Sequence, residues 1–437
     1  MAKREPNGRL RTLLTDARWS GQDFARAVNG VAAETGLTLR YDRTSVSHWL
    51  AGTRPPAHVV ALAAEALSRR TGRPVSPADT GLTRPAGIRV RDRSGGEPRG
   101  ADALTPGDAE ALFGEIPVYS SVWRPPGGPP GGPPGGGEGP ARASGRIGAE
   151  HVAAAEAVLP VFRNADMTSG SGLARPALTR YLATTVAPWL RAAAAPAVRH
   201  RLLGCTARLA YTAGFLCFDG NQQGMAQAYY RAALRLGQEA GDPGCWAPVL
   251  RAMSVQAHQL GHRKQAWELA EAAAREAGRL PSLQAAFVTG QLAVAEAGCG
   301  DRRAAVAHLG EAERLLERSA GQQPAIGDYH HAALAHQQAE ALAALGDVRG
   351  AISALGASLR QRPAGERRAR AITTARLAEL HLGRGHVERA CAAWHDLLDL
   401  VPQLDSVRVE EAVRRLRGRL HPLRAHRAAR TLLSRLP

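Results

Sequence analysis

The sequence predicts an all-α protein with an N-terminal helix-turn-helix domain, a flexible Pro/Gly linker and a C-terminal α-solenoid of paired helices. Apolar residues recur at helical spacing in both terminal parts, and strand-like alternation is absent. The tract Pro125 to Pro140, PPGGPPGGPPGGGEGP, cannot build a core and predicts a spacer. Glycines then recur about every 40 residues, each between two helix-length segments.

The chain of 437 residues is too long for one ordinary core, so we expect several units. The predicted order is a helix-turn-helix domain, a linker, a helical cap, the repeats and C-terminal capping helices. These span residues 1–82, 83–144, 145–195, 196–402 and 403–437, respectively.

The formal net charge of +17 favours a polyanionic partner. The charge also has a compositional explanation: the whole chain is rich in Ala, Arg and Gly, and only two of its basic residues are lysines. No stretch resembles a signal peptide or a membrane span of about 20 apolar residues, so we expect a cytoplasmic protein with no membrane contact. The five cysteines lack C-x-x-C spacing and are expected to be buried thiols, forming neither disulfides nor a metal site.

Capping signals define two helices in the N-terminal region. Ser20 followed by Asp23 predicts the start of one helix, and Asp42 predicts the start of a second that Gly52 ends. The apolar positions of the second helix are expected to face inward: Val46, Trp49 and Leu50.

The opposite face of the second helix is polar and suits the major groove of double-stranded DNA. Its predicted DNA-binding residues are Arg43, Thr44, Ser45, Ser47 and His48. Arg43 is the best candidate for a base contact, because arginine pairs with guanine. Arg40 and Arg54 flank the helix and are expected to contact phosphates. The alternative is that these residues merely solvate an ordinary helical bundle.

The segment RTSVSHWLAGTRPP resembles the recognition helix and exit turn of the Xre/Cro-type helix-turn-helix family. That resemblance covers some 60 residues and implies a small helical DNA-binding domain with Trp49 in its core. The connection from Gly36 to Asp42 is longer than the turn of the family's standard motif.

The C-terminal half repeats a pattern of small, glycine, small and bulky positions. The glycines are Gly220, Gly261, Gly300, Gly346 and Gly385. Seven residues before them stand Ala213, Ser254, Ala293, Ala339 and Ala378. Five residues after them stand Met225, Ala266, Ala305, Ala351 and Ala390. Small side chains let two antiparallel helices approach closely, so the pattern predicts stacked hairpins.

This spacing resembles the tetratricopeptide repeat in five copies, each longer than the family's usual 34 residues. The resemblance implies a concave groove that binds a peptide or protein. By the family's spacing its groove residues are Arg251, His258, Gln259, His336, Glu340 and Glu379. The alternative is an irregular bundle with chance glycines.

The order of parts, including FRNADMTSGSGLARPALTRYL before the repeats, resembles actinobacterial regulators related to the negative regulator of Streptomyces differentiation. This resemblance implies control of development or secondary metabolism.

Enzyme motifs are missing: we find no phosphate loop, H-E-x-x-H or G-x-S-x-G pattern. His330, His331 and His336 lie on one predicted helix but lack supporting ligands, so we expect no metal, no cofactor and no catalytic residue. The sequence thus favours a transcriptional regulator that binds DNA, as a homodimer because one such domain recognises a half-site. The rival hypothesis is an interaction scaffold without specific DNA binding.

Overall fold

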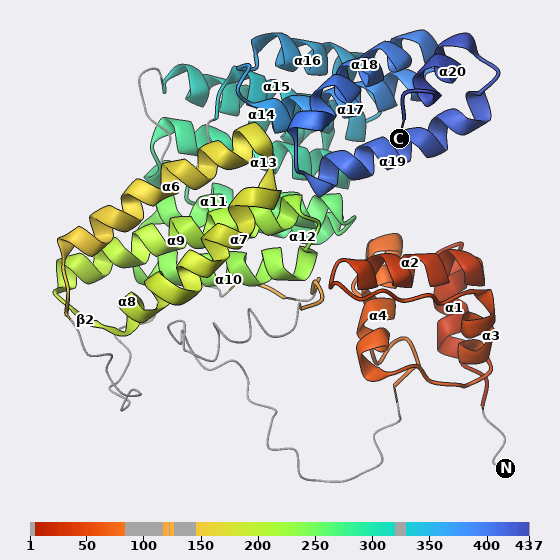
Figure 1. The fold of residues 1–437 in the computed structure, drawn as a ribbon, viewed down its shortest axis with the longest axis horizontal. Coiled ribbons are helices and arrows are strands. Elements are labelled where there is room, and N and C mark those ends of the chain that lie inside the picture. The colour runs from red at the N-terminus through yellow and green to blue at the C-terminus, as the bar shows by residue number, and fades with distance from the viewer. Residues whose placement is uncertain (1–4, 84–116, 122, 126–145, 320–328, 437) are drawn as a thin grey trace.

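The computed structural model describes residues 5–83, 117–121, 123–125, 146–319 and 329–436. Helices form almost all of it, so the predicted fold class is confirmed (Figure 1). The predicted linker at 83–144 lies outside the described residues except for Thr83, 117–121 and 123–125. In the described ranges, the one pair of strands is β1 (Arg146–Ile147) with β2 (Ala193–Ala194), two residues each.

Four helices form the N-terminal domain around one apolar core. They are α1 (Gly8–Asp16), α2 (Gly21–Ala33), α3 (Arg43–Leu50) and α4 (Ala57–Thr71). Phe24 of α2 and Trp49 of α3 pack edge to face, with ring centroids 6.1 Å apart. Both are buried with Val46, as predicted, and aromatic packing of this kind fixes how two helices meet.

The predicted caps are present. Ser20 and Asp23 form a complete capping box on α2, and Asp42 and Ser45 form another on α3. Gly52 adopts φ +97° immediately after α3, the left-handed conformation that glycine tolerates. Local sequence therefore determines where α3 begins and ends.

Five helical hairpins follow one another between residues 196 and 400 of the described chain. They pair α9 (Pro196–Asp219) with α10 (Gln223–Glu239), α11 (Pro243–Gln259) with α12 (Arg263–Ala274), α13 (Ser282–Cys299) with α14 (Arg302–Glu317), α15 (His331–Ala344) with α16 (Val348–Gln361), and α17 (Arg367–Gly383) with α18 (Val387–Leu400). The short 3₁₀ helices η2 (Ala277–Arg279) and η3 (Val401–Gln403) follow α12 and α18.

The predicted spacing gives the correct register of the hairpins. All ten predicted small positions before and after the glycines are buried. Four of the five glycines have positive φ, while at the first turn Asn221 takes this role with φ +55°. Close approach of the paired helices at these small residues holds each hairpin together.

Further helices precede and follow the hairpins. Before them lie α6 (Ala149–Ser169), α7 (Ser171–Tyr181), the π-helical turn η1 (Leu182–Val186) and α8 (Ala187–Arg191). After them lie α19 (Val407–Leu420), η4 (His421–Leu423) and α20 (Arg427–Leu433), which cover the last hairpin. The thiols of Cys205, Cys217, Cys245 and Cys391 are buried, but Cys299 is exposed, because it ends α13 at the turn.

The end of the array returns to its beginning. Asp405 donates its backbone N–H to Ser169 O at 2.7 Å and accepts from the N–H of Gly172 at 3.1 Å. Gly170, at φ +91°, lies against the Asp405 carbonyl, where a Cβ would collide. Ser406 donates to Asp219 at 2.9 Å, and Asn221 donates to Glu411 at 2.7 Å. These contacts close the stack of helices around its concave side, which the sequence did not predict.

None of the helices among the described residues is long and apolar enough to cross a membrane.

We predict that Ala293→Leu overpacks the α13–α14 contact, since Ala293 is fully buried there. Overpacking of a dense core costs about 1–3 kcal/mol. Thermal unfolding followed by circular dichroism should show a lower melting temperature. Ala307→Leu, at an exposed position of α14, is the matched control and should melt like the native protein. Equal melting of both variants would contradict close packing at Ala293.

Candidate DNA-binding face and candidate ligand cavity

The polar face of α3 is open to solvent. Arg43, Thr44, Ser47 and His48 are exposed, and we call these four residues the α3 face. Arg40, before the helix, and Arg54, after it, are exposed as well. The apolar side of the same helix is buried through Val46 and Trp49. The helix thus presents its charged side outward from a fixed core.

Both serines of α3 use their hydroxyls within the helix: Ser47 donates to the Arg43 carbonyl at 3.0 Å, and Ser45, which is only partly exposed, belongs to the cap. The Ser45 hydroxyl donates to the Asp42 carboxylate at 2.8 Å within the capping box. Hydrogen bonds from Ser45 hold the pKa of Asp42 below its usual value, so this cap remains charged at neutral pH. Its place in the cap makes Ser45 a residue that positions α3.

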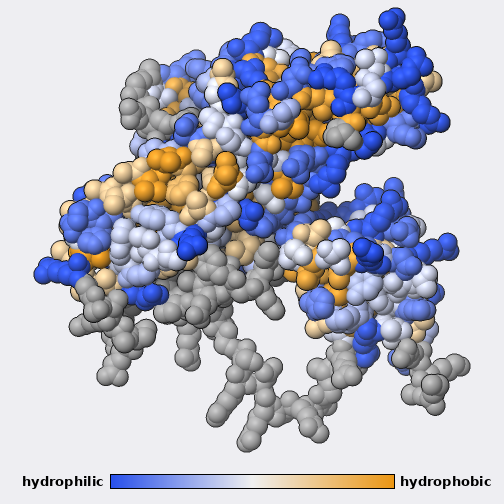
Figure 2. All heavy atoms as spheres, viewed as in Figure 1, coloured by the Kyte–Doolittle hydropathy of each residue, from blue (hydrophilic) through white to orange (hydrophobic). Residues whose placement is uncertain are grey.

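Helix α3 lies far from the repeats within the N-terminal domain. In Figure 1, α3 lies on the side of the N-terminal domain opposite to the stack of hairpins. Figure 2 shows mostly hydrophilic and intermediate residues over that outer side. The repeats therefore do not cover α3.

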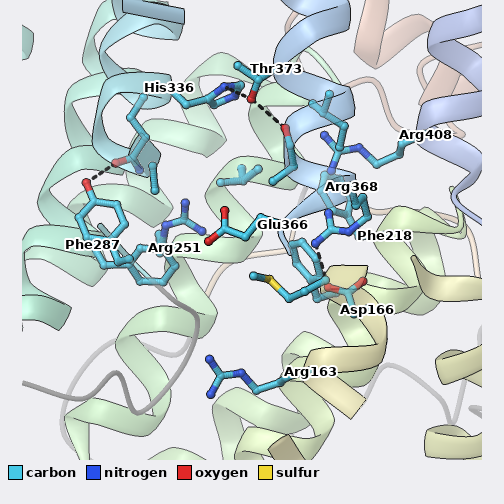
Figure 3. Close-up of a pocket in the computed structure, with 18 of the residues that line it drawn as sticks. Arg163, Asp166, Phe218, Arg251, Phe287, His336, Glu366, Arg368, Thr373 and Arg408 are labelled. Atoms are coloured by element: carbon cyan, nitrogen blue, oxygen red, sulfur yellow. Dashed lines mark hydrogen bonds and ion pairs between the residues drawn. The ribbon is translucent and has the colours of Figure 1, made fainter. Parts of the chain in front are cut away.

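A cavity of about 290 Å³ opens on the concave side of the repeats (Figure 3). Its walls come from α6 and from the first helices of the hairpins, together with Arg408 of α19. Five arginines and two carboxylates line it: Arg163, Arg251, Arg362, Arg368, Arg408, Asp166 and Glu366. Aromatic rings form much of the remaining wall: Tyr211, Phe215, Phe218, Phe287 and Tyr329.

The two carboxylates of the cavity are already paired. Asp166 accepts from Arg368 at 2.8 Å, and this buried pair joins α6 to α17. Glu366 accepts from Arg362 at 2.6 Å and lies 2.6 Å from Nε2 of His330. The nearby positive charges hold the pKa of Glu366 below its usual value against the effect of burial.

Arg251 and Arg408 have a different environment. Among the described residues, neither has a carboxylate within ion-pair distance. The Arg251 guanidinium lies 3.7 Å from the ring centroid of Phe287, and that of Arg408 lies 4.6 Å from the centroid of Phe218. The Nε of Arg251 is fully buried and has no hydrogen-bond partner among the described residues. Each of these two guanidiniums therefore lies against an aromatic ring and makes no ion pair among the described residues.

The structure brings three of the six predicted groove residues to this cavity: Arg251, Gln259 and His336. His258 points to Gly298 instead, because successive helical residues lie about 100° apart. Glu340 accepts from Arg376 at 3.0 Å, and Glu379 lies between Arg376 and Arg415. These three residues do not line the cavity.

Sequence reasoning missed the arginines that come from outside the repeats. Arg163 lies on α6 and Arg408 on α19, in segments predicted to be caps. The spacing of the repeats could not predict these two residues as cavity residues, because they come to the cavity only when the stack closes. The high arginine content of the C-terminal segment was the available signal.

A second contact joins the N-terminal domain to the repeats. Glu65 of α4 lies 3.1 Å from Nε2 of His262, which precedes α12, and both side chains are buried. Arg69 donates to Glu65 at 2.7 Å and also pairs with Glu34. Gly261, at φ +87°, lies against the carbonyl oxygen of Arg69, so this turn admits the end of α4. The interface is built around a buried network of charges.

Residues 117–121 and 123–125, which we call the docked segment, lie against both units. Val118 packs on the core of the N-terminal domain. The Tyr119 ring stacks on His262 with centroids 5.4 Å apart, and its hydroxyl donates to Gln265 at 2.8 Å. Ser120 exchanges two backbone hydrogen bonds with the Gln227 side chain, at 3.0 and 2.9 Å. Part of the predicted linker therefore connects the two domains.

Comparisons with known proteins bear mainly on the N-terminal domain. Residues 10–83 match the family model described as the SP15 N-terminal domain. No curated protein matches the chain. One similar solved structure is BtubC (BKLC) from P. vanneervenii, with 16% identity over 58% of this chain and 90% of that chain. Its TM-score of 0.34 is below the level at which two structures share a fold.

Stability should fall at acid pH because of His336. Burial lowers the pKa of His336 to about 4, helped by Arg362 and Arg408 and opposed by Glu340. Between the usual value of about 6.5 and pH 4 the unfolded chain takes up a proton that the folded chain does not. The free energy of unfolding therefore decreases as the pH falls, by about 3 kcal/mol at most from this residue.

Urea unfolding of the native protein and His336→Gln at several pH values between about 6.5 and 4 tests this prediction. Glutamine can keep a hydrogen bond to Thr373, whose Oγ1 lies 3.2 Å from Nδ1 of His336. The variant should lose stability less steeply as the pH falls. Identical pH profiles would contradict a neutral, buried His336.

Proposed function

We propose that this protein is a sequence-specific DNA-binding transcriptional regulator whose repeats bind a ligand that changes its affinity for DNA. The observation that carries the proposal is the exposed α3 face on a helix whose opposite side is locked into the domain core. A short helix of this kind places its N-terminal residues against base edges in the major groove.

The residues of the α3 face divide into two roles under this proposal. Arg43 stands at the first position of α3, where a guanidinium can pair with guanine, and Thr44 and Ser47 can adapt to several bases. Arg40 and Arg54 lie beside the helix and contact phosphates, which fixes the orientation without reading the sequence. Recognition of a palindromic site would require a homodimer, because one α3 contacts a half-site.

Ligand control needs a route from the cavity to the DNA-binding domain. The docked segment and the Glu65–His262 contact supply one, since they connect α4 to the turn before α12. A ligand shifts DNA affinity only if it binds one arrangement of the two units more tightly than another. This interface is the element whose arrangement the ligand would bias.

The double variant Arg43→Ala with Ser47→Ala tests DNA recognition. Recovery of bound DNA across the genome should give discrete sites for the native protein and lose them for the variant. Loss of each good base contact weakens specific binding by about 1–3 kcal/mol. Arg303→Ala, at an exposed position of α14, is the control and should retain the sites. Absence of discrete sites with the native protein would instead favour an interaction scaffold.

A salt titration separates the two roles of the arginines. Arg54→Ala should reduce the slope of log affinity against log salt by about 0.9, because each phosphate contact releases condensed counterions. It should weaken binding equally at all sequences. A change in sequence preference without a change in slope would contradict the phosphate role of Arg54.

Gly224→Ala tests the interdomain contact. A Cβ at Gly224 would collide with the carbonyl oxygen of Pro117, so the substitution should displace the docked segment. We expect a larger radius of gyration in small-angle X-ray scattering. Gly383→Ala is the matched control, because there is open space around the Cβ position of Gly383. Unchanged scattering of the Gly224 variant would show that the docked segment does not hold the units together.

A further inference from the structure

The cavity of the repeats holds more positive charge than its own carboxylates neutralise. Arg368 forms an ion pair with Asp166, and Arg362 forms one with Glu366. Of the other three arginines, Arg163 has an interaction of its own, so Arg251 and Arg408 remain. Figure 3 shows these two on different walls of the cavity, one from α11 and one from α19. A guanidinium stays charged in a protein, so both present donors and charge to whatever enters.

Aromatic rings surround these two cations. The Phe287 ring lies against the Arg251 guanidinium and the Phe218 ring against that of Arg408. In-plane N–H groups are the ones that bind a carboxylate or phosphate. Tyr211 and Phe215, both on α9, add apolar surface to the cavity wall. Charge recognition and an apolar wall are thus combined in one site.

The size of the cavity limits its occupant. About 290 Å³ is near the lower end of the volumes that small-molecule sites have. Residues from both ends of the array, Arg163 and Asp166 of α6 and Arg408 of α19, line this limited space. A small molecule fits this space better than the protein or long peptide that the repeat resemblance implied.

We propose that the cavity binds a small organic anion with a flat apolar body, whose carboxylate or phosphate is held by Arg251 and Arg408. This inference rests on the proposed role of the repeats as a ligand-binding unit and is independent of DNA binding. Burial lowers the pKa of both arginines, and for Arg408 the Asp219 carboxylate opposes this effect, so holding each buried charge carries a cost in stability. A bound anion would remove that cost.

Calorimetric titration of the full-length protein with three probes tests the proposal: naphthalene carboxylate, naphthyl phosphate and naphthalene carboxamide. They share one ring system and differ in charge. We expect one anion to bind each chain at least about tenfold more tightly than the neutral amide, as charge-assisted hydrogen bonds predict. The tighter of the two anions identifies the ligand as a carboxylate or a phosphate.

Variants decide whether the binding occurs at the proposed site. Arg251→Gln should weaken the tighter anion by about tenfold or more and leave the amide nearly unchanged. Arg303→Gln, on the exposed side of α14, should bind like the native protein. The proposal is overturned if neither anion binds better than the amide, or if Arg251→Gln binds the anion as the native protein does.

A measurement on the ligand-free protein tests whether Arg251 instead serves only to stabilise the fold. Arg251→Met replaces the unpaired cation by an apolar chain of similar length, so the melting temperature without ligand should rise. A lower melting temperature would mean that the guanidinium stabilises the fold, and it would overturn the assignment of Arg251 to a ligand. Failure of DNA binding alone would leave these results unaffected and would count only against the proposed regulator.

Discussion

Close approach of paired helices at small side chains is the constraint on which the rest of the structure depends. Ala293 of α13 and Ala305 of α14 are fully buried where two helix backbones approach, and the other hairpins repeat this arrangement. Because the contact is short-range, each hairpin fixes the angle of the next, and the array curves as it grows. Larger residues at these positions would change that curvature and separate the two ends of the stack.

Curvature has a chemical consequence, because it brings Asp405 to Ser169 and Arg368 to Asp166. The buried Arg368–Asp166 bond joins residues that stand 202 positions apart in the sequence. Closure thus brings Arg408 to the cavity and pairs the Asp166 carboxylate with Arg368. Arg251 and Arg408, which make no ion pair among the described residues, therefore leave positive charge on the concave side.

The N-terminal domain is attached at the opposite side from its α3 face. Glu65 and Arg69 face the repeats near the end of α4, and Gly261 gives them room at a turn of the array. Gly261 thus has two roles: it adopts the positive φ of the hairpin turn, and its lack of a side chain lets α4 approach. This arrangement leaves the polar side of α3 open to solvent, while a buried charge network holds the domain against the repeats. Such a network is sensitive to small displacements, because an unpaired buried charge is costly.

The sequence by itself determined the elements whose causes are local. The capping pairs Ser20–Asp23 and Asp42–Ser45, the inward Trp49 and the register of the repeat glycines all follow from neighbours within a few turns. The exposed polar side of α3 followed from the same periodicity, although the cap engagement of the Ser45 hydroxyl did not. The tertiary structure alone decided which arginines share a cavity, since Arg163, Arg368 and Arg408 meet only when the stack closes. It also decided that Tyr119 connects two domains, because helical spacing encodes which side of a helix is buried but not the distant surface that covers it.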